Sequence, residues 1–231
     1  MNKFLVLSIS LLFLGISSSF AQSDVIEHKK DFDHKIIHFG YYIGLNKKDF
    51  KISYTEPNTF VSVEPSVGFN VGLIAGWKIN NNITLRMEPG LSSNTKTLAF
   101  TNIEGGVIDS IRNAGGTYLH IPLLLKLSTN RLGNMRPYII GGVSYDYNFS
   151  SNEKNPDDNF SGEFRTKTSN FSYEVGLGVD LYLPYFILST SIRGIFAINN
   201  ELIPDNTSAS PWTGPIDYLG TRGVFINLAF H

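Results

Sequence analysis

The stretch FSYEVGLGVDLYL, at residues 171–183, alternates apolar side chains with polar or small ones. Leu177 lies on its apolar face, and Glu174 and Asp180 lie on the other. A period of two indicates a β-strand with two unlike faces. Seven further segments repeat the pattern, at residues 36–46, 68–79, 82–92, 117–127, 136–149, 185–198 and 221–231. No charged residue falls on the apolar face of any of them, so this face meets either a protein core or lipid.

The connections between these segments alternate in length. Short ones fall at residues 80–82, at 128–135 and around Pro184, and long ones at 47–67, 93–116, 150–167 and 199–220. Outer-membrane barrels show this alternation, with short periplasmic turns and long extracellular loops. Strands of about 9 to 11 residues cross a bilayer, and lipid tolerates no open sheet edge. The sequence therefore predicts an all-β fold, an eight-stranded antiparallel up-and-down transmembrane β-barrel.

A secreted soluble barrel, with its apolar faces turned inward, explains the alternation equally well. It does not explain the difference in loop length, and a narrow eight-strand interior would have to hold most of the bulky side chains. We therefore expect Leu177 and Leu123 to face lipid and Glu174 and Asp180 to face the interior. Aromatic girdles are expected from residues near the strand ends, namely Phe39, Trp77, Tyr145, Tyr147, Phe149, Phe171, Tyr173 and Phe186.

The N-terminus has the pattern of a secretory signal. Lys3 precedes an apolar run, and Ser19-Phe20-Ala21 supplies the small residues of a cleavage site. The run is short for a membrane anchor, the alternative reading. We expect a signal peptide at residues 1–21, a loose periplasmic segment at 22–35 and the barrel domain at 36–231, in the outer membrane of a Gram-negative-type bacterium.

Composition excludes several classes of function. The net charge of −1 gives no basic field for nucleic acid. The absence of cysteine excludes disulfides, thiolate metal sites and a cysteine nucleophile. His38 and His120 lie on predicted inward faces, where a hydrogen-bonded core role is expected. The acidic loop at 153–159 has carboxylates that calcium would accept, but a solvated loop is the stronger interpretation. We expect no enzyme activity, cofactor, metal or small-molecule substrate.

The predicted inward faces carry charges of both signs. Because a buried charge must be paired, we expect a structural network of ion pairs in the lumen, with Arg86, Arg136 and Arg193 against Glu88, Glu174 and Asp180. Glycines on these faces leave room for the long side chains. A proton or ion path is the alternative role. The full predicted network comprises Arg86, Glu88, Lys126, Arg136, Asp146, Glu174, Asp180 and Arg193.

The last long connection is the least generic loop. It contains three prolines and a lone tryptophan, and prolines restrict the conformations of a loop. Tryptophan is frequent at binding hot spots, although Trp212 could equally pack the loop onto the barrel rim. The candidate partner-binding residues are Asp205, Pro211, Trp212 and Asp217.

Several segments together resemble the PorT family of outer-membrane β-barrels. They are HFGYYIGLNKKDF (38–50), LRMEPGL (85–91), TYLHIPLLLK (117–126), RPYIIGGVS (136–144), IPDNTSASPWTG (203–214) and TRGVFINLAFH (221–231). The resemblance spans nearly the whole mature chain. It implies a part in type IX secretion, which carries folded proteins, including proteases and gliding adhesins, across the outer membrane. PorT-type proteins are similar in lacking recognised catalytic residues, so no active site is implied.

The resulting hypothesis is an accessory or assembly component of the type IX secretion and gliding-associated system. It would act through contacts with other secretion proteins, whose identity the sequence does not give. The alternative is a stand-alone outer-membrane barrel for surface binding or envelope stability. A lipid-modifying enzyme would need a polar pocket at lipid level, for which the sequence shows no cluster of residues.

Overall fold

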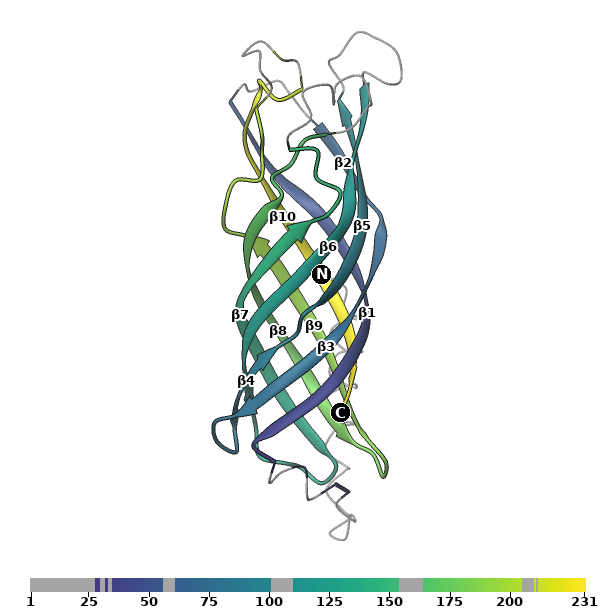
Figure 1. Cartoon of the computed structure of the whole chain (residues 1–231), viewed down its shortest axis with the longest axis vertical. Helices are drawn as coiled ribbons and strands as arrows, with labels where there is room; N and C mark the ends of the chain where they lie inside the picture. The colour runs from purple at the N-terminus through teal and green to yellow at the C-terminus, as the bar shows by residue number, and fades with distance from the viewer. Residues whose placement is uncertain are drawn as a thin grey trace, which may run out of the picture.

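A computed structural model describes residues 28–29, 32, 35–55, 61–100, 110–153, 164–204, 210 and 212–231. Ten strand segments form one antiparallel sheet (Figure 1). They are β1 (Ile37–Tyr54), β2 (Val61–Pro65), β3 (Val67–Lys78), β4 (Ile83–Met87), β5 (Gly90–Phe100), β6 (Ile111–Ser128), β7 (Met135–Asn148), β8 (Ser169–Tyr182), β9 (Ile187–Ala197) and β10 (Ile216–Phe230).

The sheet closes on itself through its first strand. On one edge β1 pairs with β3, from Ile37 opposite Trp77 to Lys47 opposite Val67. On its other edge β1 pairs with β10, where Tyr41 lies opposite Phe230. β3 pairs with β4 and β5, both of these pair with β6, and from β6 to β10 each strand pairs with the next one along the chain. The predicted antiparallel β-barrel is therefore confirmed.

The structure has ten segments where eight strands were predicted, because two strands are interrupted. Ser66 separates β2 from β3, and Glu88 and Pro89 separate β4 from β5. Pro89 has no N–H group to donate to a sheet ladder, which accounts for the second break. Both β4 and β5 keep one register against β6, since Ile83 faces Leu127 and Gly90 faces His120. The ten segments thus trace eight passages of the barrel wall.

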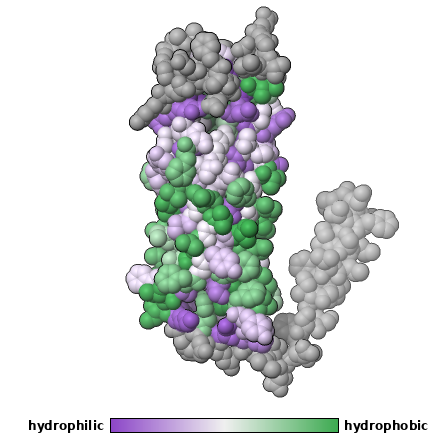
Figure 2. Space-filling model, turned by 45° about the vertical axis from the view of Figure 1, so that its right-hand side comes forward, coloured by the Kyte–Doolittle hydropathy of each residue, from purple (hydrophilic) through white to green (hydrophobic). Residues whose placement is uncertain are grey.

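The two faces of the wall have the predicted polarity. Leu177 is 63% exposed and Leu123 is 47% exposed, whereas Glu174 is only 2% exposed. Apolar side chains cover the outside of the barrel over much of its height, as Figure 2 shows. We call this zone the apolar band. It fits a bilayer, because a soluble protein does not expose a continuous apolar surface of this extent.

Aromatic side chains gather at both edges of the apolar band. At one edge the rings of Tyr145 and Phe171 are 5.3 Å apart, and those of Tyr173 and Phe196 are 5.1 Å apart. At the other edge Phe230 contacts Tyr41 and Phe186, with ring centres 5.2 and 5.8 Å apart. Paired aromatic girdles are typical of outer-membrane barrels.

The two ends of the barrel differ in their connections. One end, the turn side, carries the short connections β3–β4, β6–β7 and β8–β9. In the first, Asn80 Oδ1 accepts hydrogen bonds from the backbone N–H groups of Asn82 and Ile83, both at 2.8 Å. The other end, the loop side, carries the long connections. Within the described residues, no helix is long and apolar enough to span a membrane.

The barrel continues past the apolar band on the loop side, which the sequence analysis did not predict. Both β1 and β6 contain 18 residues, against the roughly 9 to 11 that cross a bilayer. Residues 47–54, predicted to be part of a connection, are strand. Along β1 the faces exchange polarity, because Lys47 and Lys51 point outward while Phe50 and Ile52 point inward. We call this part the loop-side extension.

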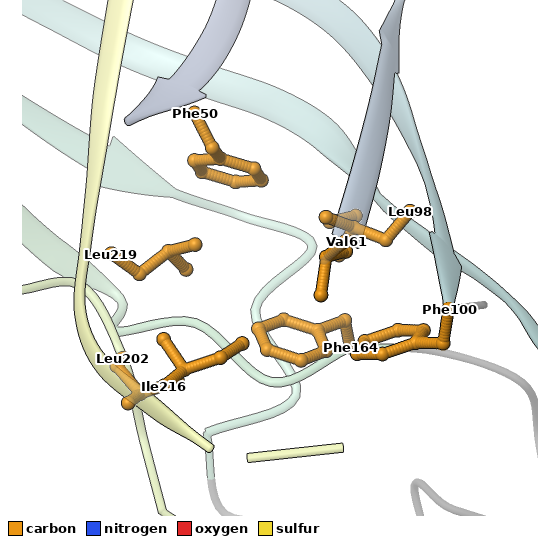
Figure 3. Close-up of a cluster of buried hydrophobic side chains, with 9 residues drawn as sticks. Phe50, Val61, Leu98, Phe100, Phe164, Leu202, Ile216 and Leu219 are labelled. Carbon is orange, nitrogen blue, oxygen red and sulfur yellow. The ribbon is translucent and has the colours of Figure 1, made fainter. Parts of the chain in front are cut away.

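An apolar cluster fills the loop-side extension (Figure 3). Its side chains come from several strands and from the two connections β7–β8 and β9–β10, so it ties the loops to the wall. This part of the molecule is therefore built like a small soluble β-barrel with an internal core. The cluster comprises Phe50, Val61, Leu98, Phe100, Ala114, Phe164, Leu202, Ile216 and Leu219.

Candidate functional site

The centre of the lumen is an ion-pair network around Arg193. Its guanidinium contacts Glu88 at 3.0 Å and Glu174 at 3.3 Å. Arg86, next but one in sequence to Glu88, forms a second pair with it. All four side chains are at least 96% buried, so each charge depends on its partners rather than on water.

His120 links this group to a second carboxylate. Its Nδ1 lies 2.8 Å from Asp146 and its Nε2 lies 3.0 Å from Glu174, so both ring nitrogens face carboxylates. Lys48 approaches Asp146 at 4.0 Å. The inward position predicted for His120 is correct. Lys48 was missed because the first strand was predicted to end at Asn46.

A separate pair closes the turn-side part of the lumen. Lys126 donates to both oxygens of Asp180, at 2.8 and 2.6 Å, and Ser189 Oγ donates to the same carboxylate at 2.5 Å. Arg136 lies opposite Asp180 in the strand register, at the turn-side mouth, with its guanidinium 5.6 Å from the ring centre of Tyr182. The place of Arg136 in the lumen network stays a prediction.

Glycine makes room for these long side chains. A Cβ atom on Gly176 would lie 2.6 Å from Cγ of Arg193, closer than any real Cβ contact. A Cβ atom on Gly178 would meet the ring of Tyr138 at 2.5 Å. Both glycines belong to the segment FSYEVGLGVDLYL at residues 171–183. The inward face of β8 thus supplies both the charged side chains and the space that long side chains of its neighbours occupy.

The charged side chains of the lumen lie in contact with one another. In the lumen Arg86, Arg193, Lys48 and Lys126, together with His120, contact the carboxylates of Glu88, Glu174, Asp146 and Asp180. Above them the apolar cluster fills the loop-side extension. Within the described part of the chain, no group of three or more histidines and acidic residues is placed to hold a metal ion. Most of the acidic loop at 153–159 lies outside the described residues.

The candidate partner loop is held partly by the barrel. Trp212 packs against the apolar cluster, and the guanidinium of Arg112 lies 4.2 Å from its ring centre. Asp217 is exposed at the start of β10, and its backbone carbonyl accepts a hydrogen bond from Asn200 at 2.9 Å. Asp205 and Pro211 lie outside the described residues. Trp212 therefore packs against the barrel interior, and the partner-binding role of the loop stays a prediction.

The described residues of the N-terminal segment are docked, although a loose segment was predicted. The N–H of His28 donates to Asn134 Oδ1 at 3.0 Å, and Arg131 donates to the carbonyl of His28 at 2.5 Å. The ring of Phe32 packs between His38 and His231, at 5.1 and 6.0 Å. The hydrogen bonds of His28 and the ring of Phe32 together hold these residues at the turn side.

The chain is similar to solved structures of bacterial outer-membrane proteins. OprG from Pseudomonas aeruginosa is 16% identical, with a TM-score of 0.46, and the match covers 84% of this chain and 93% of that one. Ail of Yersinia pestis is 14% identical, with a TM-score of 0.39 and coverage of 83% and 95%. Neisserial surface protein A is 11% identical, with a TM-score of 0.38 and coverage of 82% and 95%.

No curated protein matches the chain. A family model does, over residues 20–202, which is well over half of the sequence. Its description is "Outer membrane protein beta-barrel domain". The closed sheet, the apolar band, the aromatic girdles and the polar lumen agree with that description. The chain is therefore an outer-membrane protein and belongs to the outer membrane protein beta-barrel domain family.

Proposed function

We propose that the protein is a non-enzymatic accessory or assembly component of the type IX protein secretion system, acting through contacts with other secretion proteins. The proposal rests on the resemblance of its segments to the PorT family. The structural observation that carries it is the loop-side extension, a rigid platform beyond the membrane whose core includes Phe164 and Leu202 from the loops. Such a platform can present the loops in fixed positions to a partner.

The filled interior favours a role in binding over a role in conduction. A pore needs an open lumen, whereas here Arg193 and its carboxylates occupy the membrane level. The apolar cluster closes the loop side above them. We therefore expect function to depend on binding at the outer surface of the extension and not on passage through a channel.

In the extension, the edge of β2 that faces β1 is a candidate site for such a contact. Above Lys47 and Val67, β1 and β2 have no backbone pairing with each other among the described residues. Instead the hydroxyl of Tyr54 accepts from the N–H of Val61 at 2.9 Å and donates to its carbonyl at 3.3 Å. A side chain thus takes the place of a neighbouring strand. An extended segment of a partner could displace Tyr54 and pair with β2, a mode of recognition that uses backbone hydrogen bonds.

Two experiments test the proposal. Deletion of the gene should block export of proteins that carry the C-terminal secretion signal, while other envelope proteins stay at normal levels. Pull-down of the full chain from solubilised outer membranes should recover a large secretion barrel. Normal export in the deletion strain would remove the proposal.

The alternative is a stand-alone barrel for surface binding or envelope stability, which the dense ion-pair network also suits. In that case the chain purifies as a monomer and deletion leaves export unchanged. The variant Tyr54→Phe separates the two further. It frees the N–H and carbonyl of Val61, so it should strengthen capture of a partner by strand addition and change nothing in a stand-alone barrel.

A further inference from the structure

A pocket of about 470 Å³ opens at the turn side, at the edge of the apolar band. One wall is the docked N-terminal segment, with Lys29, Phe32 and Lys35. The other wall comes from the barrel, with Ile37 and Phe39 of β1 and Tyr185 of the β8–β9 turn, and His38, Ile187 and His231 complete the lining. Its volume is that of a small-molecule site. It is separate from the lumen network and from the loop-side extension.

Phe32 fixes the wall formed by the N-terminal segment. Its N–H donates to the carbonyl of Lys29 at 3.1 Å, and its carbonyl accepts from the N–H of Lys35 at 3.2 Å. Its ring is held against His38 and His231. Because both lysines are bonded through their backbones to an anchored residue, their positions at the pocket are determined by the fold.

Two of the described residues that line the pocket, Lys29 and Lys35, are cationic. The ammonium groups of Lys29 and Lys35 have no hydrogen-bond or ion-pair partner among the described residues. Among the described residues, no aspartate or glutamate lines the pocket. Two lysines facing one pocket attract an anion, and an anion with several acceptor oxygens satisfies both of them.

The opposite wall is apolar and continuous with the surface that faces lipid. Ile37 is 58% exposed, Phe39 is 72% exposed and Tyr185 is 87% exposed. Exposed aromatic residues at the edge of an apolar band mark the level of lipid headgroups. A ligand in this position has its anionic part beside the lysines and an apolar part against Ile37 and Phe39. A free anion would leave that apolar wall without a partner.

We propose that this pocket binds an anionic phospholipid of the membrane leaflet on the turn side. The phosphate lies between Lys29 and Lys35, and the acyl chains follow the outer face of β1. The site holds whether or not the protein takes part in secretion, because it depends only on the barrel in its membrane and on the docked segment.

The test uses the full mature chain in phosphatidylcholine bilayers that contain a minor fraction of spin-labelled phosphatidylglycerol. Immobilised lipid at the protein surface should be enriched in phosphatidylglycerol over labelled phosphatidylcholine. The variant Lys29→Gln/Lys35→Gln should lose this enrichment, by about fivefold per lysine at low salt. The matched control Lys47→Gln/Lys51→Gln removes two exposed lysines of the loop-side extension and should keep it.

Two further measurements decide the remaining outcomes. Phe32→Ala leaves the charge unchanged but releases the segment, so it should also abolish the enrichment. Added inorganic phosphate should not displace the labelled lipid; displacement at equal phosphate concentration would mean that the pocket takes a free anion and would overturn the proposal. Equal retention of the two lipids, or enrichment that survives loss of both lysines, would overturn it as well.

Discussion

The ammonium group of Lys96 lies 3.6 Å from the centre of the Phe50 ring, where the polar lumen meets the apolar cluster. Lys96 also donates to Thr221 Oγ1 at 3.2 Å, and its side chain is buried. A cation over an aromatic ring in a desolvated site is worth about 2 kcal/mol. The contact therefore links the polar lumen to the apolar cluster of the loop-side extension.

We expect a double-mutant cycle of Lys96→Met and Phe50→Leu to give a coupling energy of about 1 to 2 kcal/mol. Each single substitution should lower the free energy of unfolding in lipid or detergent, and the double variant should lose less than their sum. Denaturant titrations of the four proteins provide the measurement. Strict additivity would mean that the contact contributes nothing.

Removal of one charged partner from the ion-pair network should strongly lower the stability of the barrel. Glu174→Gln removes a carboxylate that faces both Arg193 and His120, so it leaves buried positive charge without compensation. We expect a loss of about 3 to 5 kcal/mol in the free energy of unfolding. The control Glu64→Gln, at an exposed position of β2, should change stability by less than about 0.5 kcal/mol. Equal effects of the two variants would contradict a structural role for the network.

The limits of the apolar band can be tested with one substitution made in two places. Leu177→Arg puts a charge on the lipid face near the middle of β8 and should cost about 2 to 4 kcal/mol. Thr95→Arg puts the same charge on the outer face of β5 in the loop-side extension, where Thr95 is exposed. It should be tolerated within about 0.5 kcal/mol. A large loss for Thr95→Arg would place the extension inside the membrane.

The alternation of residues predicted the barrel because the side chains of a strand point to opposite faces. The odd or even position of Leu177 and Glu174 along the strand was enough to assign Leu177 to lipid and Glu174 to the lumen. The partners of the lumen charges were harder to predict, because they depend on how far neighbouring strands are staggered. Lys126 on β6, for example, reaches Asp180 on β8, two strands away.

The loop-side extension was missed although its signal is present in the sequence. In residues 47–54 the alternation continues with the polarity of the faces reversed, since Lys47 and Lys51 are outward and Phe50 is inward. A prediction that requires the same face to stay apolar along the whole strand ends the strand where the polarity reverses. The docked N-terminal segment was missed for another reason. Its composition is polar, and it is held by the ring of Phe32 and by hydrogen bonds of the His28 backbone.

The orientation of the barrel can be read with single cysteines, because the natural chain has none. In outer-membrane barrels the short turns face the periplasm. A membrane-impermeant maleimide should therefore label Thr95→Cys on intact cells and should label Asn81→Cys, in the exposed β3–β4 turn, only after the cells are opened. The unaltered protein gives the background. The reverse labelling pattern would invert the barrel and move the lipid pocket to the other leaflet.

Glu201 should make stability depend on pH in the loop-side extension. Its carboxylate is buried and accepts hydrogen bonds from the N–H and the hydroxyl of Thr221, each at 2.8 Å. Burial raises the pKa of Glu201 above its ordinary value of 4.5, so the folded protein holds this proton to a higher pH than the unfolded chain does. Stability is then highest below the unfolded pKa and falls as the pH rises through the folded pKa.

Glu201→Gln is neutral at every pH and keeps one acceptor for Thr221, so it should lack this dependence. As the pH is raised from the acid range to neutrality, the natural chain should lose free energy of unfolding relative to Glu201→Gln. Denaturant titrations of both proteins across that range measure it. A natural chain that gains stability relative to Glu201→Gln on the same pH rise would show that Thr221 and Lys96 stabilise the carboxylate by more than burial opposes it.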